Sequence, residues 1–391
     1  MRLHAGDFRR LARARLPRFV FDYVDGAAGD ESGLQRNEQA LRGMQLVPRV
    51  LRDTRSVDTS VRVFGRAWSA PLGIAPVGFA GLVRPRADLL LARAAAQRGV
   101  PFVLSTASNT RLEAVREAAP QAVQWMQLYV MSDRSIAEQI VRRAREARFD
   151  ALVLTVDVPV GGMRERDVRN GFSLPFRPGL GTLLDLVGHP RWALRAALGG
   201  LPGFANLVAD PSRQASPQMQ AALLARTMDR ALTWESVAWL RRLWDGPLLI
   251  KGVLDARDAA RAVACGVDGL VVSNHGGRQL DLAPATVTVL PGIVDAVGGR
   301  LPVFVDSGFR SGGDVAKALA LGATAAFMGR APIWGLAAAG EAGVAEVLSL
   351  VQAELERTLI LLGASNPGEL RALETAAESL HEATLGSVTH D

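Results

Sequence analysis

Eight short apolar runs recur along the chain, and stretches with helical periodicity lie between most of them. The runs are Leu72–Pro76, Phe102–Ser105, Val123–Tyr129, Ala151–Asp157, Leu248–Lys251, Gly269–Ser273, Val303–Asp306 and Ala325–Gly329. The helical stretches include Asp88–Arg98, Ser135–Arg148, Ala256–Cys265 and Gly313–Leu321. Continuously apolar strands that alternate with amphipathic helices are typical of a parallel sheet buried on both faces. Eight such units predict a closed (β/α)₈ barrel, with residues 1–391 forming a single domain.

Two segments interrupt this regular alternation. The segment before the first run contains Leu16-Pro17-Arg18 and Phe21-Asp22-Tyr23, and we expect it to form a helical lid on the barrel. The interval between Asp157 and Lys251 is much longer than the others, and its middle, residues 177–215, is rich in leucine and arginine and contains Trp192 and Phe204. This composition suits a membrane surface or a partner surface. A packed or disordered loop is the open alternative.

Composition excludes several functional classes. The net charge is +6, but arginines alternate with acidic residues and no nucleic-acid-binding motif accompanies them, so we expect no nucleic-acid partner. The single cysteine, Cys265, excludes a disulfide framework and indicates a reducing compartment. No motif for zinc or for serine hydrolysis is present, so we expect no metal. Met1–Arg18 lacks the apolar segment of a signal peptide, and no apolar run approaches the ~20 residues of a membrane-spanning helix, which predicts an intracellular or peripheral protein.

Polar side chains stand at the carboxyl ends of the predicted strands. They are Ser105, Gln127, Tyr129, Thr155, Asp157, Lys251, Ser273, His275, Asp306 and Arg330. Catalytic groups of such barrels gather at the carboxyl ends of the strands. The sequence therefore predicts a site at this end of the barrel.

The nonapeptide Ser273–Asp281 places a proton acceptor and a carboxylate-binding group three residues apart. The His275 imidazole can accept a proton, and the Arg278 guanidinium can bind a carboxylate through two parallel hydrogen bonds. The glycines between them allow a substrate to lie close to the backbone. This pattern favours chemistry on the carbon next to a carboxylate, although a polar loop after a strand is the simpler alternative.

A phosphate site is predicted at the last two strands. Asp306-Ser307-Gly308-Phe309-Arg310 and Gly329-Arg330 combine exposed backbone N–H groups with two guanidinium groups. Barrels of this kind commonly hold a cofactor phosphate there. No Gly-x-Gly-x-x-Gly or Walker loop supports a dinucleotide or ATP site.

Taken together, these motifs resemble the FMN-dependent α-hydroxy-acid dehydrogenase/oxidase family from about Leu16 to about Leu362. The segments that carry the resemblance are Ile74–Gly78, Leu104–Asn109, Gln127–Val130, Leu154–Asp157, Arg164–Asp167, Ile250–Gly252, Ser273–Asp281 and Asp306–Arg310. Gly162–Asp167, His189–Trp192 and Met219–Leu223 are most similar to the members that oxidise (S)-mandelate. Met163 and Phe79 depart from the pattern and bear on the pocket wall.

The resemblance implies how the substrate is bound. Arg164 and Arg278 would hold its carboxylate, and Tyr129 would add a hydrogen bond. Tyr23 would contact the carboxylate or the hydroxyl group.

The resemblance also implies a base and an FMN site. His275 would accept a proton, Asp157 would orient its ring, and Lys251 would lie beside the flavin. Further FMN contacts are expected from Pro76, Val77, Gly78, Ser105, Gln127, Thr155, Ser273, Asp306, Ser307, Gly308, Arg310, Gly329 and Arg330.

The expected reaction is oxidation of an (S)-2-hydroxy acid, foremost (S)-mandelate to benzoylformate. Electrons would pass to a membrane quinone or another acceptor. The expected protein is a homotetramer, peripheral on the cytoplasmic side of the inner membrane through residues 177–215, and otherwise cytoplasmic. An L-lactate dehydrogenase, a broad 2-hydroxy-acid oxidase and, more remotely, a non-catalytic flavin- or phosphate-binding barrel remain alternatives.

Overall fold

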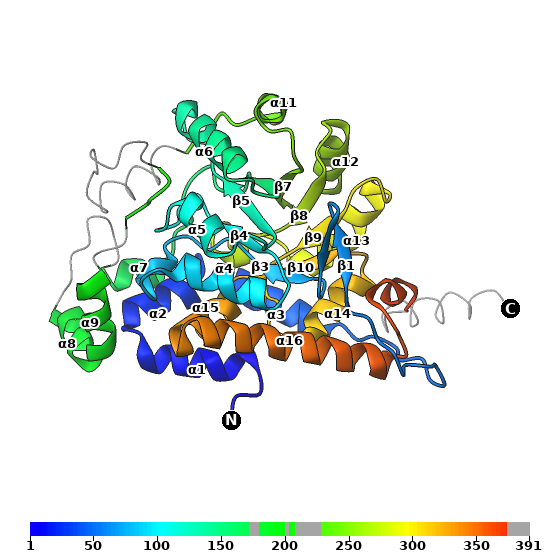
Figure 1. The fold of residues 1–391 in the computed structure, drawn as a ribbon, viewed down its shortest axis with the longest axis horizontal. Helices are drawn as coiled ribbons and strands as arrows, with labels where there is room; N and C mark the ends of the chain where they lie inside the picture. The colour runs from blue at the N-terminus through cyan, green and yellow to red at the C-terminus, as the bar shows by residue number, and fades with distance from the viewer. Residues whose placement is uncertain (172–179, 200–202, 208–227, 374–391) are drawn as a thin grey trace, which may run out of the picture.

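The computed structural model describes residues 1–171, 180–199, 203–207 and 228–373, and eight parallel strands close into a barrel within them (Figure 1). Around the barrel the strands follow the order β10-β3-β4-β5-β6-β7-β8-β9. They span Leu72–Ile74 (β3), Phe102–Leu104 (β4), Gln124–Leu128 (β5), Ala151–Thr155 (β6), Leu248–Val253 (β7), Gly269–Val272 (β8), Val303–Val305 (β9) and Ala325–Met328 (β10). Seven of the predicted runs contain one of these strands and the eighth, Leu248–Lys251, makes up the first four residues of β7, so the predicted (β/α)₈ fold is confirmed.

Helices cover the outside of the barrel, and the longer ones do so by turning an apolar stripe toward its interior. In α6, for example, Ala137, Ile140, Val141 and Ala144 are buried at helical spacing. The helices that follow the barrel strands are α4 (Ala87–Gln97), α5 (Leu112–Ala118), α6 (Arg134–Glu146), α7 (Glu165–Arg169), α11 (Trp234–Leu243), α12 (Ala256–Ala264), α13 (Thr286–Val297), α14 (Gly312–Ala320), α15 (Arg330–Ala339) and α16 (Glu341–Leu362). Short 3₁₀ turns lie at η1 (Ala80–Leu82), η3 (His275–Gly277) and η4 (Pro367–Ala372).

A hairpin that the sequence pattern did not reveal closes the amino end of the barrel. It consists of β1 (Val61–Val63) and β2 (Arg66–Trp68), which pair antiparallel. Trp68 packs with Trp125, Phe304 and Phe327 inside the barrel, with ring centroids 5.5 to 6.2 Å apart. Because this end is filled by aromatic rings, the opposite, carboxyl end is the one available for a ligand.

Three helices precede the barrel where a helical lid was expected. They are α1 (Ala5–Arg15), α2 (Arg18–Asp25) and α3 (Ser32–Gly43). Helix α1 packs outside the barrel against α15 and α16, whereas α2 brings Tyr23 and Val24 to the cavity at the carboxyl end. Of the three helices, only α2 contributes residues to the lining of the cavity, so α2 is the part of the segment that forms the predicted lid.

The described part of the long insertion contains helices α8 (Leu180–Gly188) and α9 (Pro190–Gly199), which lie beside α2 (Figure 1). Trp192 donates its indole N–H to the Leu82 carbonyl at 2.9 Å and packs edge-on against Phe19. Phe204 is buried at 6% exposure. Neither aromatic side chain therefore belongs to the outer surface of the insertion, because Trp192 packs against α2 and Phe204 is buried. Within the insertion 177–215, residues 177–179, 200–202 and 208–215 lie outside the described residues.

No helix among the described residues is long and apolar enough to cross a membrane.

Candidate active site

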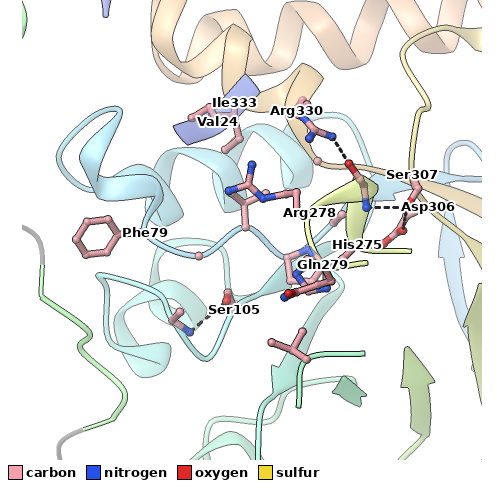
Figure 2. Close-up of a pocket in the computed structure, with 18 of the residues that line it drawn as sticks. Val24, Phe79, Ser105, His275, Arg278, Gln279, Asp306, Ser307, Arg330 and Ile333 are labelled. Atoms are coloured by element: carbon pink, nitrogen blue, oxygen red, sulfur yellow. Dashed lines mark hydrogen bonds between the residues drawn. The ribbon is translucent and has the colours of Figure 1, made fainter. Parts of the chain in front are cut away.

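A cavity of about 340 Å³ opens at the carboxyl ends of the barrel strands (Figure 2). Most of the predicted site residues line it: Tyr23, Pro76, Val77, Gly78, Ser105, Tyr129, Arg164, Lys251, His275, Arg278, Asp306, Ser307, Gly308, Arg310, Gly329 and Arg330. Gln127, Thr155, Asp157 and Ser273 lie behind this lining and hydrogen-bond to its residues or to one another. The structure thus brings all the predicted residues together.

His275 lies between a carboxylate and a phenol. Its Nδ1 is 3.0 and 3.1 Å from the two carboxylate oxygens of Asp157, and its Nε2 is 3.3 Å from the Tyr129 hydroxyl. A proton on Nδ1 satisfies the carboxylate, which leaves the Nε2 lone pair directed at the cavity. Nε2 is then an acceptor within reach both of the Tyr129 hydroxyl and of a molecule bound in the cavity. This arrangement prepares His275 to accept a proton from a bound molecule.

Electrostatics keep these partners in the required protonation states. Burial raises the pKa of Asp157, but the charges of His275 and Lys251 outweigh it and hold that pKa below its ordinary value. Asp157 therefore stays anionic and stabilises a protonated imidazole. Burial, with the nearby Asp157 charge, raises the pKa of Tyr129, so its hydroxyl stays protonated and remains a donor.

A second ion pair lies deeper in the barrel. The Lys251 Nζ is 3.1 Å from Asp306 Oδ2 and donates to Ser273 Oγ at 2.6 Å. Burial lowers the pKa of Lys251, but Asp306 and Asp157 more than offset this and raise it. The lysine is therefore a fixed positive charge, 4% exposed, at the floor of the cavity.

Two arginines form a cationic pair around an aromatic ring. The guanidinium carbons of Arg164 and Arg278 lie 5.4 and 5.2 Å from the centre of the Tyr23 ring. Burial, and secondly the Arg164 charge, lower the pKa of Arg278. Arg164 contacts Asp167 at 3.1 Å, while Arg278 donates to the Gly26 carbonyl at 2.8 Å. A carboxylate bound between the two guanidinium groups would relieve their mutual repulsion.

A chain of polar side chains crosses the ends of three strands. Ser105 Oγ donates to Gln127 Oε1 at 3.2 Å, and Gln127 Nε2 donates to Thr155 Oγ1 at 3.1 Å. The loop after β4 is anchored from outside by Asp88, whose carboxylate accepts a 2.7 Å hydrogen bond from Ser108. Complete burial raises the pKa of Asp88 to about 6.

The far end of the cavity carries the predicted phosphate residues. Arg330 donates to the carbonyls of Asp25, Gly26 and Gly276 at 2.8 to 3.2 Å, and burial together with its arginine neighbours lowers its pKa to about 9. Arg310 forms a 2.6 Å ion pair with Glu38.

The backbone at Gly276 shows why the loop beneath His275 needs glycine. Gly276 has φ +67° and donates to Ser307 Oγ at 2.9 Å, and a Cβ there would lie 2.8 Å from Arg330. A side chain at this position would displace the arginine.

Three of the eight described non-glycine residues with positive φ line this cavity. Among the described non-glycine residues, Phe79, His275 and Ser307 line the cavity and have φ of +59°, +59° and +81°. Such conformations cost roughly 1–3 kcal/mol each and persist where the surroundings enforce them. The surrounding structure therefore fixes the direction of these three side chains in spite of an unfavourable backbone conformation.

Several residues of the site were not predicted. Asn37 on α3 and Asn274 exchange two buried side-chain hydrogen bonds of 2.8 and 3.0 Å, which tie the His275 loop to α3. Gln279, Phe204 and Met228 line the cavity. Asn274 and Gln279 lie within the nonapeptide and could have been included, whereas no local pattern marks Asn37, Phe204 or Met228 as site residues.

The donor set fits FMN. Two arginines and the loops at Gly308 and Gly329 offer positive charge and backbone N–H groups to a phosphate. The buried Lys251 ammonium, which is paired with Asp306, supplies a positive charge that suits an electron-rich ring. The Ser105–Gln127–Thr155 chain supplies neutral hydrogen-bonding groups for the ring or ribityl oxygens and nitrogens.

Comparisons with known proteins agree with this geometry. Residues 12–376 match the family described as FMN-dependent dehydrogenase. The (S)-mandelate dehydrogenase of Pseudomonas putida is 46% identical over 357 residues, which are 91% of this chain and 89% of that protein. An L-lactate dehydrogenase of Chromohalobacter salexigens is 43% identical over 365 residues, which are 93% of each chain.

A solved structure matches over nearly the whole length. It is described as the crystal structure of monotopic membrane protein (S)-mandelate dehydrogenase, has a TM-score of 0.91 at 44% identity, and the match covers 95% of this chain and 99% of that chain. With the family match and these relatives, the chain belongs to the FMN-dependent 2-hydroxy-acid dehydrogenases.

Proposed function

We propose that this enzyme oxidises (S)-2-hydroxy acids with an aromatic substituent, foremost (S)-mandelate to benzoylformate. The observation that carries the proposal is the cavity in which the Asp157–His275 pair faces the Arg164–Arg278 pair beside an aromatic wall. The arginine pair suits a carboxylate, and Nε2 of His275 suits the proton of the neighbouring carbinol. The relative from Pseudomonas putida is named for the same substrate.

Each side chain has one task in this proposal. Arg164 and Arg278 bind the carboxylate, while Tyr129 donates a hydrogen bond to the substrate oxygen or to His275. His275 Nε2 accepts a proton, and the anionic Asp157 stabilises the imidazolium that results. Tyr23 packs against both guanidinium groups and donates to the Gly78 carbonyl at 3.0 Å.

Bound FMN supplies the acceptor for the two electrons that leave the substrate. Lys251 holds a positive charge beside the ring, and Ser273 fixes the Lys251 ammonium by accepting its hydrogen bond. Pro76, Val77 and Gly78 present backbone atoms to the same cavity. We assign the phosphate to Ser307, Gly308, Arg310, Gly329 and Arg330.

L-Lactate dehydrogenase activity is the second candidate, because relatives with that name are 43% identical, close to the 46% of the mandelate enzyme. A broad 2-hydroxy-acid oxidase would use the same site. A non-catalytic barrel is disfavoured because His275, Arg164 and Arg278 line one cavity. Asp157 lies directly behind His275, within hydrogen-bonding distance of its Nδ1.

Anaerobic bleaching of the flavin absorption band tests the proposed reaction and its substrate together. Purified holoprotein is mixed with (S)-mandelate, (R)-mandelate, L-lactate or glycolate, and flavin reduction is followed with time. We expect the largest ratio of rate to dissociation constant for (S)-mandelate. A larger ratio for L-lactate would replace the proposed substrate, and no bleaching by any of them would refute the reaction.

We further propose that α8 and α9 contact the membrane. Leu184 and Val187 on α8, and Leu194 and Leu198 on α9, recur at helical spacing and are 61 to 81% exposed. Arg195 lies on α9 itself, and burial, followed by the charges of Arg195 and Arg15, lowers the pKa of Arg84. An apolar helical face with a cationic rim suits an anionic lipid surface.

Vesicle binding tests this surface without removing the insertion. The variant combines Leu184→Ser, Val187→Ser, Leu194→Ser and Leu198→Ser. The control, Ile360→Ser with Leu361→Ser, removes exposed apolar residues from the end of α16, far from α8 and α9 (Figure 1). We expect the parent and the control to sediment with anionic phospholipid vesicles at low salt and the fourfold variant to remain in solution. Equal binding by all three, or none by the parent, would refute the proposal.

The cellular location, the electron acceptor and the oligomeric state complete the proposal. We propose a peripheral enzyme on the cytoplasmic side of the inner membrane that passes electrons to a membrane quinone, and a homotetramer. Faster reoxidation of the reduced protein by a quinone analogue than by oxygen would support the acceptor. Light scattering of the detergent-solubilised protein tests the tetramer.

A further inference from the structure

We infer that Phe204, brought into the cavity by the insertion, forms with Phe79 an apolar wall that selects the α-substituent of the substrate. This inference rests on the proposed oxidation of 2-hydroxy acids and assigns its specificity to a segment that no catalytic motif includes. The two ring centroids are 5.3 Å apart, and both residues line the cavity.

The backbone beside Phe204 is fastened to the barrel by consecutive hydrogen bonds. The Ala205 N–H donates to the Ser108 carbonyl at 3.0 Å, and Asn206 donates to the Thr110 carbonyl at 3.0 Å. Asn206 also accepts from the Leu112 N–H at 3.0 Å. A segment held at three successive points of the loop after β4 places its phenyl ring reproducibly.

One side chain positions both halves of the wall. Asn109 accepts a 2.8 Å hydrogen bond from the Gly81 N–H, two residues after Phe79, and donates a 2.8 Å hydrogen bond to the Gly203 carbonyl, one residue before Phe204. Phe79 itself has φ +59°, a backbone conformation that is unfavourable for phenylalanine and persists only where surrounding contacts enforce it. The two rings are therefore positioned as a unit.

The wall lies on the substrate side of the cavity. Tyr23 contacts Phe79 edge-on at 6.4 Å, and its ring also contacts both carboxylate-binding arginines. In Figure 2, Phe79 lies at the opposite end of the view from Asp306 and Ser307, with Arg278 and His275 between them. A substrate whose carboxylate meets the arginines and whose carbinol meets His275 would turn its remaining substituent toward the phenyl rings.

The chemistry of the wall defines the substituent. Phe79, Phe204 and the buried Met228 present no charge and no hydrogen-bonding group other than the thioether of Met228. Aromatic rings pack favourably in offset or edge-on contacts, and such pairs contribute more than the burial of their apolar area alone. The wall therefore favours an aryl group over the methyl group of lactate or the hydrogen of glycolate.

The test compares substrates within each variant rather than total activity. Phe204→Ala, Phe204→Leu and the parent holoproteins are mixed anaerobically with (S)-mandelate or L-lactate, and the ratio of reduction rate to dissociation constant is measured for each. We expect the preference for mandelate over lactate to fall by about 10-fold or more in Phe204→Ala, because apolar pocket contacts discriminate by roughly 10–200-fold. Phe204→Leu should fall between Phe204→Ala and the parent.

Leu207→Ala is the matched control, since Leu207 is buried in the same segment but does not line the cavity. It should leave the substrate preference within about twofold of the parent even if it lowers thermal stability. If the parent prefers mandelate and Phe204→Ala keeps that preference, or if Leu207→Ala changes it equally, the wall is refuted. If the parent itself shows no preference for mandelate, the proposed aromatic substrate fails, and the wall fails with it as a selective element.

Discussion

Replacing Asp157 by asparagine isolates the charge behind His275. The substitution keeps the size of the side chain and one acceptor oxygen but removes the negative charge that lies 3.0 and 3.1 Å from Nδ1. We expect FMN and carboxylate ligands to bind as before, because Asp157 does not line the cavity. We expect flavin reduction by substrate to become much slower, because the imidazolium formed by proton transfer loses its counter-charge.

The magnitude follows from the geometry. Unit charges about 3 Å apart attract by roughly 5 kcal/mol at an effective dielectric constant of about 20. An asparagine oxygen retains about 1–2 kcal/mol of this as a hydrogen bond to a charged donor. The net loss of about 3–4 kcal/mol corresponds to a reduction rate lower by roughly 10²–10³-fold.

Stopped-flow flavin reduction under anaerobic conditions measures this effect directly. The matched control is Asp150→Asn, at the other end of the same strand, where the carboxylate pairs with Arg66 at 2.9 Å and Arg116 at 3.2 Å. That variant removes a paired carboxylate far from the cavity and should lower stability without slowing reduction. A reduction rate for Asp157→Asn within tenfold of the parent, with FMN fully bound, would show that the charge has no such role.

Three further predictions address other parts of the site. His275→Ala should keep FMN but slow reduction by roughly 10²–10⁴-fold, and more than a tenth of the parental rate would exclude His275 as the base. Arg278→Lys should raise the dissociation constants of substrate and carboxylate inhibitors, because an ammonium cannot form the bidentate pair; unchanged constants would contradict the clamp. Asp88 has a pKa raised to about 6 in the folded protein, so the fold keeps a proton that the unfolded chain releases, and stability decreases as pH rises from about 4 to about 6. Between about pH 4 and 6, the free energy of unfolding should fall by about 3 kcal/mol less in Asp88→Asn than in the parent, as measured by denaturant unfolding. An unaltered pH dependence would contradict the raised pKa.

Much of the fold could be predicted because buried parallel strands have a strong sequence pattern. Each apolar run between helical stretches became a barrel strand, and the polar residues at the strand ends met in one cavity. The β1–β2 hairpin was missed because Arg62 and Arg66 interrupt its short strands, so neither forms the continuous apolar run by which the barrel strands were recognised. It is recognised only through Trp68, whose partners come from distant strands.

The contacts of the insertion could not be predicted, because composition does not say which way a side chain faces. Trp192 and Phe204 are residue types found at membrane surfaces, yet both pack inward. Trp192 contacts Phe19 and Leu82, and Phe204 contacts Phe79. Likewise, nothing near Asn37 in the sequence indicates its buried pair with Asn274. Both depend on contacts between residues far apart in the chain.

A crystal structure of the oxidised holoprotein with bound benzoylformate tests the central claim most directly. The account predicts the carboxylate between Arg164 and Arg278, the keto oxygen within hydrogen-bonding distance of His275 Nε2 or the Tyr129 hydroxyl, and the phenyl ring against Phe79 and Phe204. A carboxylate bound away from the arginine pair, or a keto oxygen out of reach of His275, would contradict the proposed chemistry.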